Sequence, residues 1–328
     1  MRHPSGSNMT SRAARLHAPD CFRTELLELR EPAAGEVRVR LEGCGVCASN
    51  LPLWQGRPWF SYPLNPGAPG HEGWGAIDAI GADVTGFATG ERVALISQHA
   101  YAEHDFATTD SVVKLPAGLA GRPFPGEPLA CAMNILRRSE IEAGQTVAVV
   151  GIGFLGAVVS MLAARAGAYV VAFSRRPFAL QVAERLGASA VLGLEEPGRA
   201  LRDAWRLSGN KGYERVIECV GSQDALDLAS ELAGTRARLV IAGYHQDGER
   251  RVNLQQWNWR GLDVVNAHER DPSEYRRGMR EAIDLAVRAD LDLSALLTHQ
   301  FPLADTAAAF DALARRPDGF LKALIVCQ

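Results

Sequence analysis

Hydrophobic and polar residues alternate over short runs in the first third of the chain. Residues 36–41 read Glu-Val-Arg-Val-Arg-Leu, and a period of two is typical of a half-buried β-strand. Glycine- and proline-rich connections, such as residues 57–70, separate these runs. We therefore expect a β-rich first part with strands at residues 36–41, 75–80, 92–96 and 111–115.

Apolar strands alternate with amphipathic helices in the middle of the chain. Strands are expected at residues 146–150, 169–173, 215–220, 238–242 and 262–266. Helices are expected at residues 155–166, 176–186 and 223–232. This alternation is typical of βαβ units, so the middle part is expected to form a buried parallel sheet. The last part adds predicted helices at residues 272–289 and 304–314 and a strand at 320–326.

Composition narrows the class of protein. A chain of 328 residues has room for two domains. Its net charge of −3 gives no reason to expect nucleic acid or an anionic membrane as a partner, and no apolar run approaches the roughly 20 residues of a membrane span. The six cysteines are scattered, which favours free or metal-bound thiols. Residues 1–10 lack the apolar stretch of a secretory signal, so we expect a cytoplasmic protein.

A glycine pattern follows the first strand of the middle part. The pattern G-x-G-x-x-G is met by Gly151, Ile152, Gly153, Phe154, Leu155 and Gly156. A strand before it and a helix after it are the context in which such a loop binds a dinucleotide, with the pyrophosphate at the helix N-terminus. Gly151 permits the tight turn, Gly153 leaves room for the pyrophosphate, and Gly156 lets helix and strand pack closely. The alternative is a glycine-rich turn without a ligand.

The end of the next strand indicates which dinucleotide binds. Sites for NAD place Asp or Glu there, on the ribose 2′-hydroxyl. This chain has Ser174, followed by Arg175 and Arg176. Hydroxyl and guanidinium groups can bind a 2′-phosphate, which a carboxylate would repel. We therefore predict NADP(H) in preference to NAD(H); the alternative is that both arginines only cap an exposed loop.

Side chains that can bind a metal occur in the first part of the chain. They are Cys47, His71 and Glu72, with Ser49 close to the cysteine. Catalytic zinc needs three protein ligands and one open position, but the spacing of these residues matches no simple zinc finger. By spacing alone, a histidine beside a glutamate is more often structural than metal-binding.

Further motifs make the pattern specific, because they occur in one order along the chain. They are residues 47–50, the triplet at 70–72, residues 86–87 and 90–93, the nucleotide loop after residue 150, residues 217–221 and the closing region at 302–323. Together they resemble the medium-chain dehydrogenase/reductase family, in its zinc-dependent alcohol and polyol (sorbitol-type) dehydrogenase branch. The resemblance extends from about residue 36 to the C-terminus.

This resemblance implies an architecture and an activity. It implies a GroES-like, β-rich catalytic domain of residues 1–122 and 269–328, and a Rossmann domain with a doubly wound parallel sheet at residues 123–268. The implied activity is hydride transfer between NADP(H) and a small alcohol, aldehyde or ketone, with a polyol or sugar-like compound as one possibility. Relatives form homodimers or homotetramers, and we expect a homo-oligomer here.

The resemblance also implies roles for individual residues. Cys47 and His71 would be zinc ligands, Glu72 a ligand or a carboxylate close to the ion, and Ser49 the hydroxyl that bonds the substrate oxygen. Glu127 precedes a proline as in the polyol subgroup, so it is expected to be the third ligand. Cys131, one helical turn further on, is the alternative. We expect one catalytic zinc and no structural zinc, since residues 95–113 contain no cysteine.

Two departures from the family's pattern keep other functions open. Asn50 replaces the usual aspartate, and we expect its carbonyl to accept the imidazole N–H without supplying a charge. Pro52 replaces the histidine that passes the proton to solvent in many relatives. One alternative is a zinc-free NADPH-dependent quinone- or enoyl-type reductase on the same fold, against which Cys47 and His71 count. The other is an NADPH-binding protein without turnover.

Overall fold

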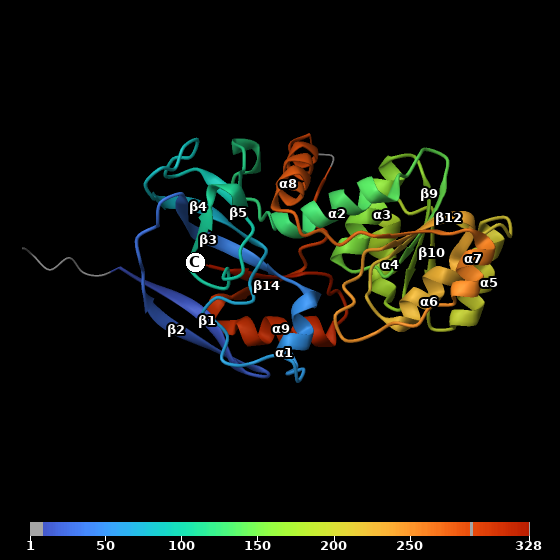
Figure 1. The fold of residues 1–328 in the computed structure, drawn as a ribbon, viewed down its shortest axis with the longest axis horizontal. Helices are drawn as coiled ribbons and strands as arrows, with labels where there is room; N and C mark the ends of the chain where they lie inside the picture. Colours follow the sequence, from blue (N-terminus) through green and yellow to red (C-terminus); the bar gives the residue numbers. More distant parts are fainter. Residues whose placement is uncertain (1–8, 289–290, 328) are drawn as a thin grey trace, which may run out of the picture.

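The computed structural model describes residues 9–288 and 291–327. Residues 1–8, which make up most of the polar leader, lie outside this part, as does residue 289 at the end of the helix expected at 272–289. None of the described helices is long and apolar enough to cross a membrane. Two large sheets lie towards opposite ends of the long axis in Figure 1, and helix α2 (Gly126–Ser139) runs between them.

The first sheet gathers the early strands and the end of the chain. Its strand order is β14-β15-β3-β4-β5-β7, and β6 pairs with β3 outside that path. The strands are β3 (Glu36–Val46), β4 (Gly73–Ile80), β5 (Arg92–Leu95), β6 (His104–Thr108), β7 (Val112–Lys114), β14 (His299–Pro302) and β15 (Ala323–Val326). The alternation of residues predicted an end of the first of these strands at residue 41, whereas β3 continues through Gly43 and Gly45. Both glycines are needed there, because a Cβ would lie 2.6 Å from the Trp74 ring at Gly43 and 1.7 Å from a Glu72 oxygen at Gly45.

A separate hairpin, which was not predicted from the sequence, precedes this sheet. Strands β1 (Thr10–Ala18) and β2 (Cys21–Glu28) pair antiparallel. The buried apolar residues of β1 are Ala13, Ala14 and Leu16. Small alanines among charged residues give a weak hydrophobic alternation, which explains why the strand was missed.

The second sheet is entirely parallel and has the strand order β10-β9-β8-β11-β12-β13. Its strands are β8 (Thr146–Val150), β9 (Tyr169–Ser174), β10 (Ala190–Gly193), β11 (Tyr213–Glu218), β12 (Ala233–Ile241) and β13 (Asp263–Asn266). The helices between them are α3 (Phe154–Arg165), α4 (Pro177–Arg185), α5 (Pro197–Leu207), α6 (Gln223–Leu232) and α7 (Leu254–Arg260). The order reverses between β8 and β11, and ligands of such sheets bind at this switch point. The expected mixed α/β architecture is confirmed, because a mainly antiparallel sheet and a doubly wound parallel sheet are both present.

Two elements of the second sheet were absent from the sequence prediction. Helix α5 has apolar residues at helical spacing, but the ones that it buries are only the small Ala200 and Ala204. Strand β10 has four residues, none of them fully buried. Both lie at or near an edge of the sheet, where the hydrophobic pattern is weakest.

Helix α2 joins the two sheets into one packed structure. A single hydrophobic cluster contains Trp74 of the first sheet, Val149 of the second and Leu129 of α2. Helix α8 (Pro272–Val287) packs along α2, where Gly278 leaves no room for a Cβ beside Ala130. The start of α2 is therefore held at the junction of the sheets. The boundaries between the two domains, expected at 122/123 and 268/269, stay predictions.

Two further helices complete the first part of the molecule. They are α1 (Leu51–Trp54) and α9 (Thr306–Arg315). The Trp54 ring is almost fully buried, stacks on Phe22 at 5.6 Å between ring centroids, and lies 5.4 Å from Phe310. This aromatic packing fixes the short segment that follows Cys47.

Candidate metal and cofactor site

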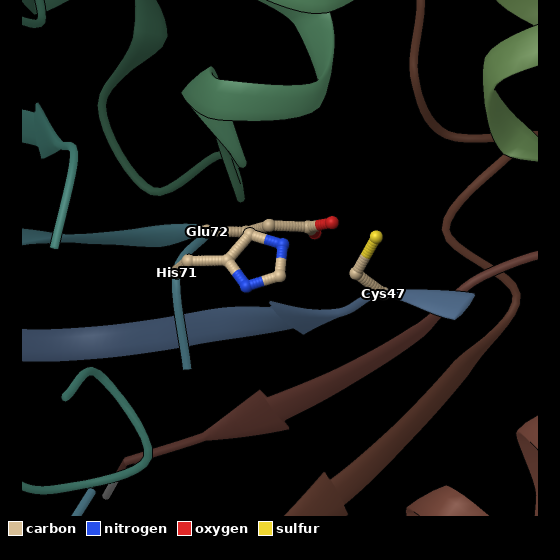
Figure 2. Close-up of side chains that lie close together, drawn as sticks. All are labelled: Cys47, His71 and Glu72. Atoms are coloured by element: carbon tan, nitrogen blue, oxygen red, sulfur yellow. The ribbon is translucent and has the colours of Figure 1, made fainter. Parts of the chain in front are cut away.

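Three side chains with metal-binding atoms meet at one end of the first sheet. Cys47 follows the end of β3, whereas His71 and Glu72 immediately precede β4. The two strands pair antiparallel with Cys44 opposite Gly73, and this register brings the segments together. One ligand atom from each of Cys47, His71 and Glu72 lies within 4.8 Å of the others, and Figure 2 shows the three side chains around one space.

His71 is oriented by a backbone carbonyl. Its Nδ1 lies 3.0 Å from the Pro69 oxygen, which leaves Nε2 as the ring nitrogen free to face a ligand. The expectation that the Asn50 carbonyl accepts the imidazole N–H is wrong. The Asn50 amide instead donates to the same Pro69 oxygen at 3.1 Å, so one carbonyl accepts from both side chains.

The surroundings of His71 are strongly anionic. Burial alone would lower the pKa of His71, but its hydrogen bond with Cys47 and the negative charges around it raise the pKa to about 10. Those charges belong to Cys47, Glu127 and Glu72. A cluster with this much negative potential is electrostatically suited to a bound cation.

Glu72 is paired with a lysine from the far end of the chain. Its carboxylate is fully buried, and Lys322 Nζ lies 2.6 Å from both of its oxygens. Burial alone would lower the pKa of Lys322, but the charges of Glu72 and Cys47 raise it. In the sequence, residue 322 belongs only to a closing motif, and no role was predicted for it. A lysine inside the apolar run predicted as a strand at residues 320–326 is the one sequence signal for it.

Glu127 and Cys131 lie side by side on the first turns of α2, as expected from their spacing. Cys131 Sγ is 3.3 Å from Glu127 Oε1. Burial raises the pKa of Glu127, and the positive charges of His71 and Lys322 oppose this shift. Burial and the Glu127 charge raise the pKa of the Cys131 thiol well above its usual value. Neither residue belongs to the close ligand group that the described residues form, but Glu127 acts electrostatically on it.

Ser49 lies in a turn beside the metal-type ligands. It belongs to the 3₁₀ turn Ala48–Asn50, and its Oγ lies 3.2 Å from Cys47 Sγ. Its backbone oxygen accepts a hydrogen bond of 2.6 Å from the Gln246 side chain. The hydroxyl is therefore close to the sulfur, and the turn is tied to the second sheet.

The glycine loop has the backbone that a dinucleotide needs. Gly151 has φ +96°, and a Cβ there would lie 2.2 Å from Val220. A Cβ on Gly156 would lie 2.0 Å from the Gly151 oxygen, so this glycine allows α3 to approach β8. A Cβ on Gly153 would meet no atom within 4 Å, which leaves open space at the start of α3. Phe154 and Leu155 begin that helix, one residue earlier than expected.

The residues at the end of β9 differ in their partners. The backbone N–H of Arg176 donates to Ser174 Oγ at 3.1 Å. The Arg176 guanidinium donates to the carbonyls of Ile152 at 2.9 Å and Phe320 at 2.5 Å. Burial, followed by the charge of Arg316, lowers the pKa of Arg176. Arg175 is exposed, so Arg176 holds the glycine loop while Arg175 faces solvent.

Comparisons with known proteins agree with this arrangement. The alcohol dehydrogenase GroES-like domain family matches residues 33–121, and the zinc-binding dehydrogenase family matches residues 155–285. An alcohol dehydrogenase of Geobacillus stearothermophilus is 32% identical over 67% of this chain and 74% of its own length. A 2-dehydro-3-deoxy-L-galactonate 5-dehydrogenase of Pseudoalteromonas atlantica is 27% identical over 90% of this chain and 93% of its own. Human sorbitol dehydrogenase is 26% identical over 90% of each chain.

Solved structures show the same fold. The 2R,3R-butanediol dehydrogenase of Bacillus subtilis superposes with a TM-score of 0.85 at 22% identity, covering 96% of this chain and 99% of its own. A zinc-binding dehydrogenase of Sinorhizobium meliloti 1021 bound to NADP superposes with a TM-score of 0.83 at 23% identity, covering 97% and 99%. The chain therefore belongs to the zinc-type medium-chain dehydrogenase/reductase family, in its polyol branch, and is an alcohol dehydrogenase in the broad sense.

Proposed function

We propose that the chain binds one catalytic zinc ion and uses NADP(H) to interconvert an alcohol, of polyol or sugar-like type, and the corresponding carbonyl compound. The observation that carries the proposal is the convergence of Cys47, His71 and Glu72 within 4.8 Å. Thiolate, imidazole and carboxylate are the ligand types that zinc takes in proteins. When bound, zinc supplies Lewis acidity at the substrate oxygen and NADP(H) supplies or accepts the hydride.

The proposed ligands are Cys47, His71 and Glu127, with Glu72 beside them. The hydrogen bond from Lys322 to Glu72 Oε1 supports this division, because it engages one oxygen and neutralises the charge of that carboxylate. Glu72 Oε2, a buried atom that accepts no hydrogen bond among the described residues, keeps Glu72 available beside the ion. Glu127 lacks a cationic partner at hydrogen-bonding distance among the described side chains, and its closest recorded contact is Cys131. Cys131 remains the alternative third ligand.

Ser49 is the proposed hydroxyl for the substrate oxygen. Its Oγ lies close enough to Cys47 Sγ to face the same space as the metal ligands. In either direction of the reaction, the hydroxyl can share the proton of that oxygen. Pro52 offers no proton carrier, so the proton leaves Ser49 by a route that does not use this position.

The preference for NADP(H) is proposed from the end of β9. Ser174 ends the strand and Arg175 follows it, so a 2′-phosphate would meet a hydroxyl and a guanidinium group instead of a carboxylate. Arg176 would act through the loop, since it binds the Ile152 carbonyl.

The location and assembly are proposed as cytoplasmic and homo-oligomeric. Strand β13 is an edge of the parallel sheet, and its Val264 side chain is 36% exposed. The neighbouring Trp259 on α7 is 90% exposed. An unpaired strand edge beside exposed apolar side chains is suited to pair with a second copy, and sedimentation analysis of the purified protein would measure the assembly.

The deciding experiment measures zinc and turnover together. Wild-type protein should contain about one zinc per chain and should oxidise sorbitol or 2,3-butanediol with NADP⁺. Cys47→Ala should lose the zinc and the turnover, whereas Cys21→Ala, at a free cysteine in the β1–β2 hairpin, should keep both. Equal zinc in the wild type and Cys47→Ala would refute the site. Turnover that persists without zinc would favour a zinc-free reductase, and zinc-loaded protein that never turns over NADPH with aldehydes or ketones would favour a binding protein.

A further inference from the structure

A loop of the cofactor-binding sheet reaches across to the metal site. Residues 242–253 connect β12 with α7. Within this loop, Gln246 Nε2 donates to the backbone oxygen of Ser49 at 2.6 Å, although 197 residues separate them. Ser49 lies two residues after Cys47, so this bond connects the carboxyl end of β12 in the parallel sheet with the turn that bears the proposed catalytic hydroxyl.

The loop is anchored on a buried carboxylate. Glu218 ends β11 and is fully buried. Its Oε1 accepts the backbone N–H groups of Val220 at 2.6 Å and Gly221 at 2.8 Å. Its Oε2 lies 3.0 Å from His245 Nε2. Three N–H groups thus compensate a charge that would otherwise be costly to bury.

His245 connects Glu218 with the rest of the loop through hydrogen bonds. Arg250 Nε lies 3.0 Å from His245 Nδ1, and a guanidinium can only donate. The imidazole is therefore a donor at Nε2, towards Glu218, and an acceptor at Nδ1. Arg250 also donates to the Gly221 carbonyl at 3.0 Å and pairs with Asp247. The side chains on both sides of Gln246 are consequently fixed.

Close backbone packing restricts the same loop. A Cβ on Gly243 would lie 2.2 Å from the Gly221 nitrogen and 2.6 Å from Glu218 Oε2. Gly221 has φ +86°, and a Cβ there would lie 2.6 Å from the Tyr244 oxygen. The backbones that leave β11 and β12 therefore touch, which leaves little freedom in where Gln246 points.

Ser49 itself, by contrast, has few hydrogen bonds within its turn, although the next residue, Asn50, donates to the Pro69 carbonyl. The turn is a three-residue 3₁₀ turn without a side-chain hydrogen bond at its cap. The Ser49 hydroxyl contacts the Cys47 sulfur, a weak acceptor. The Gln246 amide, which is held in the loop after β12, is thus the strongest restraint that the structure shows on the Ser49 carbonyl.

We propose that Gln246 is a positioning residue, which sets the Ser49 turn relative to the bound nicotinamide cofactor, and that Glu218, His245 and Arg250 hold Gln246 for this task. The inference rests on the proposed function of Ser49. Reaction rates depend steeply on such placement, since a displacement of about 1 Å can cost about 100-fold. Loss of the Gln246 donor therefore acts on the rate of the chemical step more than on binding.

The test compares Gln246→Met, which keeps the length of the side chain but removes the donor, with Gln255→Met on the exposed face of α7. Hydrogen–deuterium exchange of the full-length zinc-loaded protein should rise at least fivefold at residues 48–52 in Gln246→Met and stay unchanged in Gln255→Met. With NADP⁺ and sorbitol or 2,3-butanediol, kcat should fall about 10- to 100-fold in Gln246→Met. The primary deuterium isotope effect on kcat should rise, because the chemical step becomes slower. Zinc content, NADPH dissociation constant and Tm should match those of Gln255→Met.

Each outcome separates this inference from the function on which it rests. Unchanged exchange at residues 48–52 overturns the inference, whether or not the enzyme turns over either alcohol. Loss of zinc, NADPH affinity and Tm together with kcat also overturns it, since it shows a general structural role. Wild-type protein without zinc or any turnover is the failure of the proposed function, and the exchange measurement still decides the link between Gln246 and Ser49.

Discussion

Lys322 Nζ lies 2.6 Å from both carboxylate oxygens of Glu72, in a pair that joins positions 250 residues apart and is almost completely buried. The same ammonium group is 5.1 Å from the centroid of the Phe154 ring, at the start of the helix behind the cofactor loop. The Lys322 side chain therefore lies between Glu72 of the candidate metal site and Phe154 of the glycine loop. It also explains how a fully buried carboxylate is tolerated next to Cys47.

Replacement of Lys322 by methionine should destabilise the fold. Removal of one partner of a buried pair leaves the other charge uncompensated, which costs about 3–5 kcal/mol. Urea unfolding of the metal-free protein measures this free energy. The double variant Lys322→Met/Glu72→Gln is the control, because it removes both charges and should recover part of the loss. A double variant as unstable as the sum of the two single variants would show that the pair contributes nothing.

Replacement of Gly45 by alanine should disturb the same pair. The added Cβ would lie 1.7 Å from Glu72 Oε2 and 3.0 Å from the Lys322 side chain, so the carboxylate must move. Overpacking of this kind typically costs about 1–3 kcal/mol, and zinc affinity should fall with it. Gly118→Ala is the matched control, since a Cβ there would meet no atom within 4 Å and the backbone is not left-handed. Equal stability and equal zinc affinity in the two variants would contradict the packing argument.

The sequence was most informative where a residue's role is local. The turn at Gly151 and the close helix–strand contact at Gly156 were predicted correctly, because both depend on the neighbouring backbone, whereas the role of Gly153 towards a pyrophosphate stays a prediction. Cys47 and His71 were selected from motifs, and the pairing of β3 with β4 then brings them together. That pairing joins strands whose hydrophobic alternation was readable in the sequence.

The sequence was least informative where the role depends on long-range packing. Lys322 reaches Glu72 because β15 pairs with β3, with Ala323 opposite Val46, and no local pattern encodes that register. Arg176 is a guanidinium with carbonyl partners on two distant segments, which spacing alone does not reveal. Asn50 donates to a carbonyl where an acceptor role was expected, because the Pro69 oxygen occupies the position facing the imidazole.

The third zinc ligand can be assigned by two variants on one helix. Glu127→Ala should lower zinc affinity at least tenfold, because it removes an anionic ligand, whereas Cys131→Ala should change it less than threefold. The comparison is well matched, since both side chains start from the first turns of α2 and contact each other. Competition with a chelator of known affinity gives both constants. A larger loss of zinc affinity in Cys131→Ala than in Glu127→Ala would assign the third ligand to Cys131.

The cofactor preference is expected to depend on Arg175 and Arg316. Arg316 ends α9 in a left-handed conformation, and its pKa is lowered first by burial and then by the charge of Arg175. No ion pair is recorded for either guanidinium among residues 9–288 and 291–327, so their repulsion would be relieved by an anion. Arg175→Asp should lower the affinity for NADPH about 10- to 100-fold relative to NADH, since a hydrogen bond to a charged group contributes about 1.5–3 kcal/mol.

Arg316→Ala should lower the same affinity ratio in the same direction by a smaller factor, about three- to tenfold, if its guanidinium shares the phosphate. Arg315→Ala provides the control on the same helix, because Arg315 is paired with Asp311 at 3.0 Å and should not affect the ratio. Fluorescence titration with NADPH and NADH measures both constants without any substrate. A wild-type protein that binds NADH as tightly as NADPH would remove the basis for the NADP(H) proposal. A preference for NADPH that survives Arg175→Asp would instead place the 2′-phosphate on other residues.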